Sequence, residues 1–126
     1  DVNNDGNHYT TIIMMLRGMM LECLFKGALV NQGNITCKNE ELNIPGEYSK
    51  HNLVSMADGI SDFVYTEKEK DILERLGYYI IAGRLPRKKI NTGKFKGYWF
   101  ADDDSVYNDI LKKVEEIYSN ALRGSK

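Results

Sequence analysis

Apolar residues recur with helical spacing along most of the chain, and polar segments separate the apolar stretches. The longest stretch predicts a first helix over roughly residues 8–31. Its apolar positions at helical spacing predict a core stripe made of Ile12, Ile13, Leu16, Met19, Met20, Cys23, Leu24 and Ala28. The apolar surface continues around most of this helix, through Met14, Met15, Leu21 and Phe25. We therefore expect the helix to lie at the centre of a bundle or to carry a second interface.

Two further helices are predicted after a loop at residues 34–48, where the periodicity disappears and Pro45-Gly46 signals a turn. A short helix at residues 49–59 carries one apolar face, made of Leu53, Met56, Ala57 and Ile60. The next helix starts with a capping box, in which Thr66 and Glu69 each satisfy the other's backbone N–H. Its core face is Ile72, Leu73, Leu76, Tyr79 and Ile80. It ends near Gly83, because Pro86 prevents easy continuation.

A last helix is predicted over residues 103–122, and its acidic first turn suits the positive end of the helix dipole. Its core face is Val106, Ile110, Val114, Ile117, Tyr118 and Ala121. No stretch alternates with a period of two for long enough to predict a sheet. The sequence thus predicts a single all-α domain over residues 1–126, with flexible ends at 1–7 and 123–126. It is a bundle of about four helices, three long and one short, with a basic loop before the last helix.

Composition narrows the class of protein without identifying a function. Hydrophobic residues make up 42% and charged residues 28%, which is ordinary for a soluble globular domain. The formal charge of −1 gives no global attraction to nucleic acid or to a membrane. The 2 cysteines are too few for a disulfide framework or a cysteine-based zinc site, so we expect a reducing, cytoplasmic setting. Cys23 lies in an apolar run and is expected to be a small buried hydrophobe.

The apolar run from Thr11 to Val30 is about as long as a membrane span. It carries Arg17, Glu22 and Lys26 in its interior, and each charge is costly at membrane depth. We therefore expect a helix of a soluble protein and no membrane partner.

Three segments together resemble a known family. "ECLFKGALVNQG" places a Glu-x-x-x-Lys pair at the end of the long first helix, "KHNLVSMAD" is similar to a His-(Asp/Asn)-Leu segment, and "TEKEKDILERLGYYIIAGRLP" is similar to a helix that closes on Gly-Arg-Tyr-Pro. Their order and spacing, over roughly residues 15–117, resemble the HEPN superfamily of bacterial and archaeal helical-bundle domains. The chain looks most like its uncharacterised members with the Gly-Arg-Tyr-Pro element, although Leu85 stands where tyrosine is usual.

The family includes metal-independent RNases that carry an Arg-x(4–6)-His motif. This sequence lacks that motif, because no arginine lies five to seven residues before His8 or His51. The RNase activity therefore cannot be carried over to any residue here. What the resemblance still implies is a helical bundle, frequent homodimerisation, and nucleotide, RNA or protein partners.

Two polar features of the predicted helices have both a structural and a functional interpretation. His51 could protonate or hydrogen-bond a phosphate near neutral pH, or it could cap and pack against a helix entry, which we favour. Glu22 and Lys26 stand four residues apart in the favourable order for an intrahelical pair, and they could also line a groove. If the pair is partly buried, removing one member strands a charge.

The basic loop is the candidate nucleic-acid or nucleotide site. It carries six cations within thirteen residues that contain no acid, namely Arg84, Arg87, Lys88, Lys89, Lys94 and Lys96. Aromatic residues lie inside or beside it, at Phe95, Tyr98, Trp99 and Phe100. Cations can neutralise phosphates and aromatic rings can stack on bases. Cations after a helix also complement its unpaired carbonyls, an interpretation we favour for Arg84, and Trp99 could cover one end of the core.

The sequence lacks the common catalytic and cofactor-binding motifs, which argues against catalysis and against a cofactor. The sequence contains no Ser-His-Asp order, no glycine-rich phosphate cradle and no histidine-rich metal spacing. Asp102, Asp103 and Asp104 are consecutive and suit helix capping better than metal binding. The leading hypothesis is a non-catalytic HEPN-like module that forms a homodimer or binds a protein partner, because the first helix is apolar almost all round. The alternatives are an RNA- or nucleotide-binding domain that uses the basic loop, and a divergent HEPN RNase or toxin that uses His51.

Overall fold

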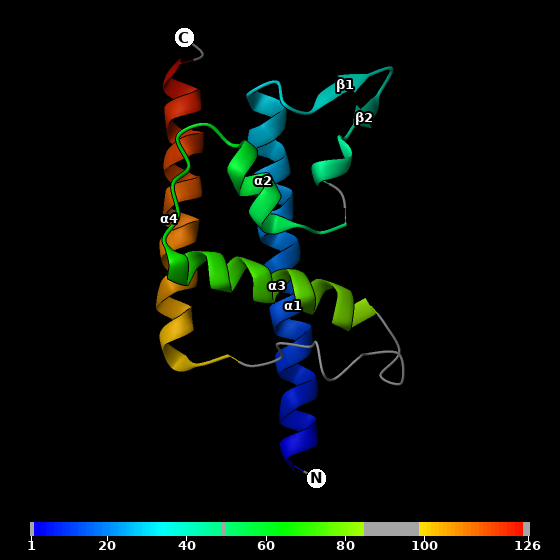
Figure 1. Ribbon diagram of the computed structural model, residues 1–126, viewed down its shortest axis with the longest axis vertical. Helices are drawn as coiled ribbons and strands as arrows, with labels where there is room; N and C mark the ends of the chain where they lie inside the picture. The colour runs from blue at the N-terminus through cyan, green and yellow to red at the C-terminus, as the bar shows by residue number, and fades with distance from the viewer. Residues whose placement is uncertain (1, 49, 85–98, 125–126) are drawn as a thin grey trace.

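The computed structural model describes residues 2–48, 50–84 and 99–124, with side chains described over 11–48, 50–81 and 99–123 (Figure 1). Its elements in chain order are α1 (Val2–Asn31), β1 (Thr36–Lys38), β2 (Glu41–Asn43), the 3-10 helix η1 (Gly46–Tyr48), α2 (Leu53–Gly59), α3 (Glu67–Arg84) and α4 (Ala101–Gly124). The prediction of a mainly α-helical fold is confirmed, and the described residues form three long α-helices and one short one.

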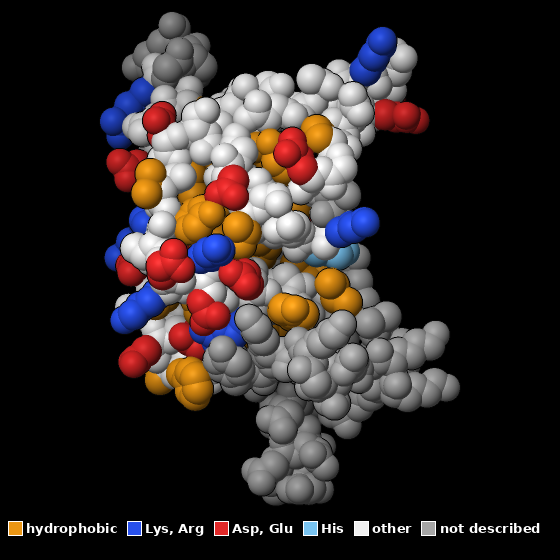
Figure 2. Space-filling view, viewed as in Figure 1, with side chains coloured by type: hydrophobic (Ala, Val, Ile, Leu, Met, Phe, Trp, Pro, Cys, Tyr) orange, Lys and Arg blue, Asp and Glu red, His pale blue; other side chains and the backbone are white. Residues whose placement is uncertain are grey.

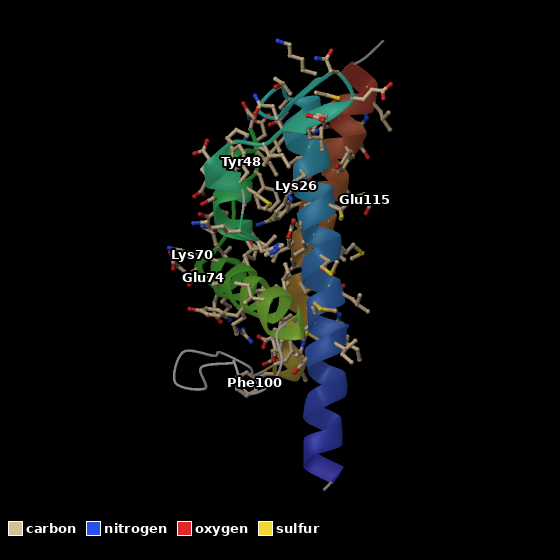
Figure 3. The ribbon with its side chains drawn as sticks, turned by 90° about the vertical axis from the view of Figure 1, so that its right-hand side faces the viewer. Lys26, Tyr48, Lys70, Glu74, Phe100 and Glu115 are labelled. Carbon is tan, nitrogen blue, oxygen red and sulfur yellow. The ribbon has the colours of Figure 1, made fainter. Side chains whose placement is uncertain are left out.

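The helices form two layers. α1 and α4 run side by side in the same direction, and α3 lies across them while α2 packs on α1 (Figure 1). Figure 3, turned by 90°, shows α3 and η1 together on one side of α1. No described element covers the opposite side of α1 (Figure 3). The amino-terminal part of α1 extends past α3 as a projecting rod (Figure 1).

The core lies between the two layers. Its fully buried large side chains include Leu21, Phe25, Leu29, Leu53, Met56, Ile72, Leu76, Tyr79 and Ile110. The predicted core faces of α2 and α3 are confirmed, since each of their named residues is buried. On α4, Ile110 and Val114 are buried as predicted, and Tyr107 joins them although the pattern did not include it.

The predicted core stripe of α1 is largely wrong. Ile12, Ile13, Leu16, Met20 and Cys23 are exposed, whereas Ala28 is buried as predicted. The other buried residues of this helix are Met14, Leu21, Phe25 and Leu29. Periodicity cannot choose between two faces when both are apolar. Gly18 identifies the true inner face, because an added Cβ would lie 2.8 Å from Ile80 Cγ1 and 3.0 Å from the Leu76 carbonyl oxygen. α3 therefore packs where α1 has no side chain.

Several boundaries also differ from the prediction. α1 begins at Val2 and so includes most of the segment predicted as a flexible lead-in, while α2 begins only at Leu53. The predicted loop at 34–48 contains an antiparallel hairpin, in which Cys37 pairs with Leu42. Each strand has 3 residues, too few for a period-two pattern to be recognised. Both residues of its turn have positive φ, 54° at Asn39 and 67° at Glu40, as a type I′ turn requires.

The capping box predicted at the start of α3 is confirmed. The Thr66 N–H donates to Glu69 Oε1 at 2.7 Å, and the Glu69 N–H donates to Thr66 Oγ1 at 3.1 Å. Glu69 is also buried against α4, where its Oε1 accepts a hydrogen bond from Lys113 Nζ at 2.5 Å. One carboxylate thus both starts α3 and joins it to α4.

The acidic start of α4 caps the helix as predicted. Asp103 Oδ2 accepts the Phe100 N–H at 2.8 Å and also receives Arg75 Nη1 at 2.7 Å. Arg75 lies on the core face of α3 and is almost fully buried. The described helices include none with the length and hydropathy needed to cross a bilayer.

Candidate functional site

Glu22, Lys26 and His51 form one hydrogen-bonded group, which we call the Glu22 cluster. Lys26 Nζ donates to Glu22 Oε2 at 2.7 Å, and His51 Nδ1 lies 2.7 Å from Glu22 Oε1. The first two residues come from α1, and His51 comes from the turn before α2. The predicted pair of Glu22 and Lys26 is confirmed, and Figure 3 shows Lys26 on the side of α1 that faces Tyr48. The structure therefore unites two features that the sequence pattern had left separate.

The Glu22 carboxylate is held in its ionised form. Partial burial raises the pKa of Glu22, but the hydrogen bonds from Lys26 and His51 outweigh burial and leave the pKa below its usual 4.5. An ionised carboxylate only accepts hydrogen bonds, so His51 Nδ1 carries the proton that it shares with Glu22. A carboxylate on Nδ1 fixes both the tautomer and the orientation of an imidazole ring.

His51 also lines a pocket of about 360 Å³ between α3 and the segment that runs from η1 to the start of α2. We call it the His51 pocket. Its apolar lining comes from Leu53, Val54, Leu73, Tyr78 and Ile81, and its polar lining from Glu47, Lys50, His51, Asn52, Ser55 and Glu74. Figure 2 shows basic, imidazole and hydrophobic side chains close together on this side of the molecule. The arrangement can bind a small molecule that has both apolar and charged parts.

A second feature is the exposed apolar face of α1. Ile13, Leu16, Met20 and Cys23 follow one another at alternating spacings of three and four residues, and we call them the outer stripe. Ile13, Leu16 and Met20 expose 47%, 55% and 45% of their surface, and Cys23 is exposed as well. This corrects the prediction that Cys23 is buried. The spacing is that of the contact positions in a coiled coil.

Trp99, a candidate of the basic loop whose side chain is described, packs at the start of α4. Its Nε1 donates to Asp104 Oδ1 at 2.9 Å. The guanidinium carbons of Arg17 and Arg75 lie 5.7 Å and 5.5 Å from its ring centre, and its ring meets Tyr107 edge-on. Arg17 also reaches Asp104 at 2.7 Å. These contacts give Trp99 a role in joining α1, α3 and α4.

The side chains of the cationic candidates in the basic loop lie outside the described residues. Arg84 ends α3, but its side chain lies outside the described residues, as do Arg87, Lys88, Lys89, Lys94 and Lys96. Binding of RNA or a nucleotide by this loop stays a prediction.

Sequence reasoning missed the arginine network around Trp99. Arg75 falls between Ile72, Leu76 and Tyr79 on the predicted core face of α3, and Arg17 interrupts the apolar run of α1. A charge at a core position indicates a buried partner, so both arginines carried a signal. The signal does not identify the partners, because Asp103 and Asp104 lie far from the two arginines in the sequence.

The described residues contain no group of three or more His, Cys, Asp or Glu side chains that could hold a metal ion. Comparison of the chain with models of known families, with curated proteins and with solved structures gave no match. The resemblance to the HEPN superfamily therefore rests on its three sequence motifs.

Proposed function

We propose that this chain is a non-catalytic, HEPN-like self-association module that dimerises through the outer stripe of α1. The observation that carries the proposal is the row of exposed apolar side chains at alternating spacings of three and four on a 30-residue helix. A contiguous exposed apolar surface on a soluble domain is typical of an interaction site. The three HEPN-like motifs support the same function, because the resemblance implies homodimerisation.

A second copy of the chain fits the outer stripe better than an unlike partner does. The stripe contains no charged residue, so it offers no charge pattern that would select a partner of different sequence. Knobs-into-holes packing needs the same period of three and four on both helices, and a second α1 supplies it. In a two-fold dimer the same surface patch of each chain faces its copy. Because the outer stripe is uncharged, this arrangement brings no like charges together.

The site chemistry supports a binding function more than a catalytic one. The Glu22 cluster fixes a histidine at a pocket, but the RNase motif is absent from the sequence. The cluster also has a structural role: Glu22 pairs with Lys26 within α1 and joins α1 to the turn before α2 through His51.

Analytical ultracentrifugation tests the dimer directly. The wild-type chain is expected to sediment as a dimer at micromolar concentration, and the double variant Leu16→Glu/Met20→Glu as a folded monomer, because like charges would face each other across the interface. Leu42→Glu is the matched control: Leu42 is 52% exposed, close to the 55% of Leu16, but lies on the hairpin. A wild-type chain that stays monomeric, or a double variant that still dimerises, would overturn the proposal.

A further inference from the structure

The lining of the His51 pocket carries charges of both signs. One wall is the segment before α2, with Lys50 and His51, and the other is α3, with Glu74. Glu74 lies on the side of α3 that faces away from α1 (Figure 3). Glu47, from η1, adds a second carboxylate to the lining. The salt bridges found among the described residues use neither Lys50, Glu47 nor Glu74.

The backbone holds the basic wall in an uncommon conformation. Lys50 and His51 both have φ of 62°, in the left-handed region that residues other than glycine seldom adopt. The hydrogen bond from His51 to Glu22 ties this turn to α1. Gly77 allows this turn to approach α3, because a Cβ added at Gly77 would lie 3.1 Å from the His51 carbonyl oxygen. Two contacts therefore fix a strained turn at the mouth of a pocket, as occurs at ligand sites.

The charges restrict the class of ligand. A simple anion would meet the carboxylates of Glu47 and Glu74, and a simple cation would meet Lys50. A zwitterion satisfies both walls, with its carboxylate toward Lys50 and its ammonium group toward Glu74. The apolar lining between the walls, which includes Leu53, suits an aliphatic or aromatic body. The volume of about 360 Å³ accommodates a molecule of that size.

We propose that the His51 pocket binds a small zwitterion with an apolar body, the chemistry of a free apolar α-amino acid. Lys50 binds the carboxylate, Glu74 binds the ammonium group, and the apolar side chain packs on Leu53 and Leu73. This binding site does not depend on the outer stripe, because no described residue of α1 lines the pocket.

Titration of the full chain by amide NMR with three related compounds tests the proposal. Leucine carries both charges, 4-methylpentanoate lacks the ammonium group, and isoamylamine lacks the carboxylate. Leucine is expected to shift the amide signals of residues around His51, and each single-charge analogue is expected to bind about tenfold or more weakly, because one charged wall is left unpaired.

Single variants connect the binding to the two walls. Lys50→Gln and Glu74→Gln are each expected to weaken leucine binding about tenfold, as the loss of one charge-assisted hydrogen bond predicts. Lys70→Gln is the control, because Lys70 stands one turn before Glu74 on α3 and does not line the pocket. Equal binding of all three compounds would show an apolar site without charge selection. That result, or no shift at about 10 mM leucine, where even very weak binding registers, would overturn the proposal.

Discussion

At the scale of single residues, Glu22 connects two segments of the chain. Its two carboxylate oxygens bind side chains from two segments, Lys26 in its own helix and His51 in the turn before α2. Its side chain is only 13% exposed, so the carboxylate exchanges most of its water for these two partners. Loss of one member of such a partly buried group leaves the others with unpaired charge.

Replacement of Glu22 by glutamine is expected to reduce the free energy of unfolding by about 2 kcal/mol near neutral pH, since charge-assisted hydrogen bonds are lost from a partly buried site. Because the folded state lowers the pKa of Glu22 below 4.5, its contribution is complete above that pH and is lost as the pH falls through the folded-state pKa. Urea unfolding at several pH values should therefore show that the difference in unfolding free energy between the wild type and Glu22→Gln decreases below pH 4.5.

Glu115→Gln serves as the control for this series, because Glu115 is exposed on α4 and forms no salt bridge found among the described residues. It should leave the unfolding curve close to that of the wild type. A Glu22→Gln chain as stable as the wild type at neutral pH would contradict the role assigned to the Glu22 cluster.

At the scale of elements, the sequence predicted a helix boundary well where the interactions that form it lie between residues close in the chain. The start of α3 follows from Thr66 and Glu69, which are three residues apart and need no other part of the chain. The same carboxylate then binds Lys113 on α4, a contact between residues 44 positions apart that no local pattern contains. The cap therefore orients α3 and also helps to dock α4.

Thr66→Ala is expected to lower the free energy of unfolding by about 1 kcal/mol, because the Glu69 N–H loses its side-chain acceptor at the start of α3. Thermal unfolding followed by circular dichroism measures the change. Ser105→Ala, at an exposed position in the first turns of α4, is the matched hydroxyl deletion and should have a much smaller effect. Equal losses from both variants would argue against the capping role.

At the scale of the whole molecule, the main limit of the sequence was the choice of which α1 face is buried. Both faces are apolar, so the core stripe was predicted on the wrong side, and Gly18 marks the right one only once α3 is known to cross there. His51 joined Glu22 through a turn with positive φ at Lys50 and His51, a conformation that neither residue type indicates. These contacts depend on tertiary packing, which local periodicity does not encode.

The wrong prediction for α1 has a functional consequence for the molecule. Residues expected in the core of one chain are the residues that we propose form the interface between two chains, at the outer stripe. Association that buries exposed apolar surface is favourable, because it removes that surface from water.

The two cysteines test this interface most directly, because both are exposed in the single chain and only Cys23 belongs to the outer stripe. The measurement is the rate of maleimide labelling at each cysteine, resolved by mass spectrometry, over protein concentrations that span dimer formation. Labelling of Cys23 should slow several-fold as concentration rises, while labelling of Cys37 on the hairpin stays constant. If Cys23 reacts as fast in a concentrated, dimeric sample as in a dilute one, the outer stripe is not the interface.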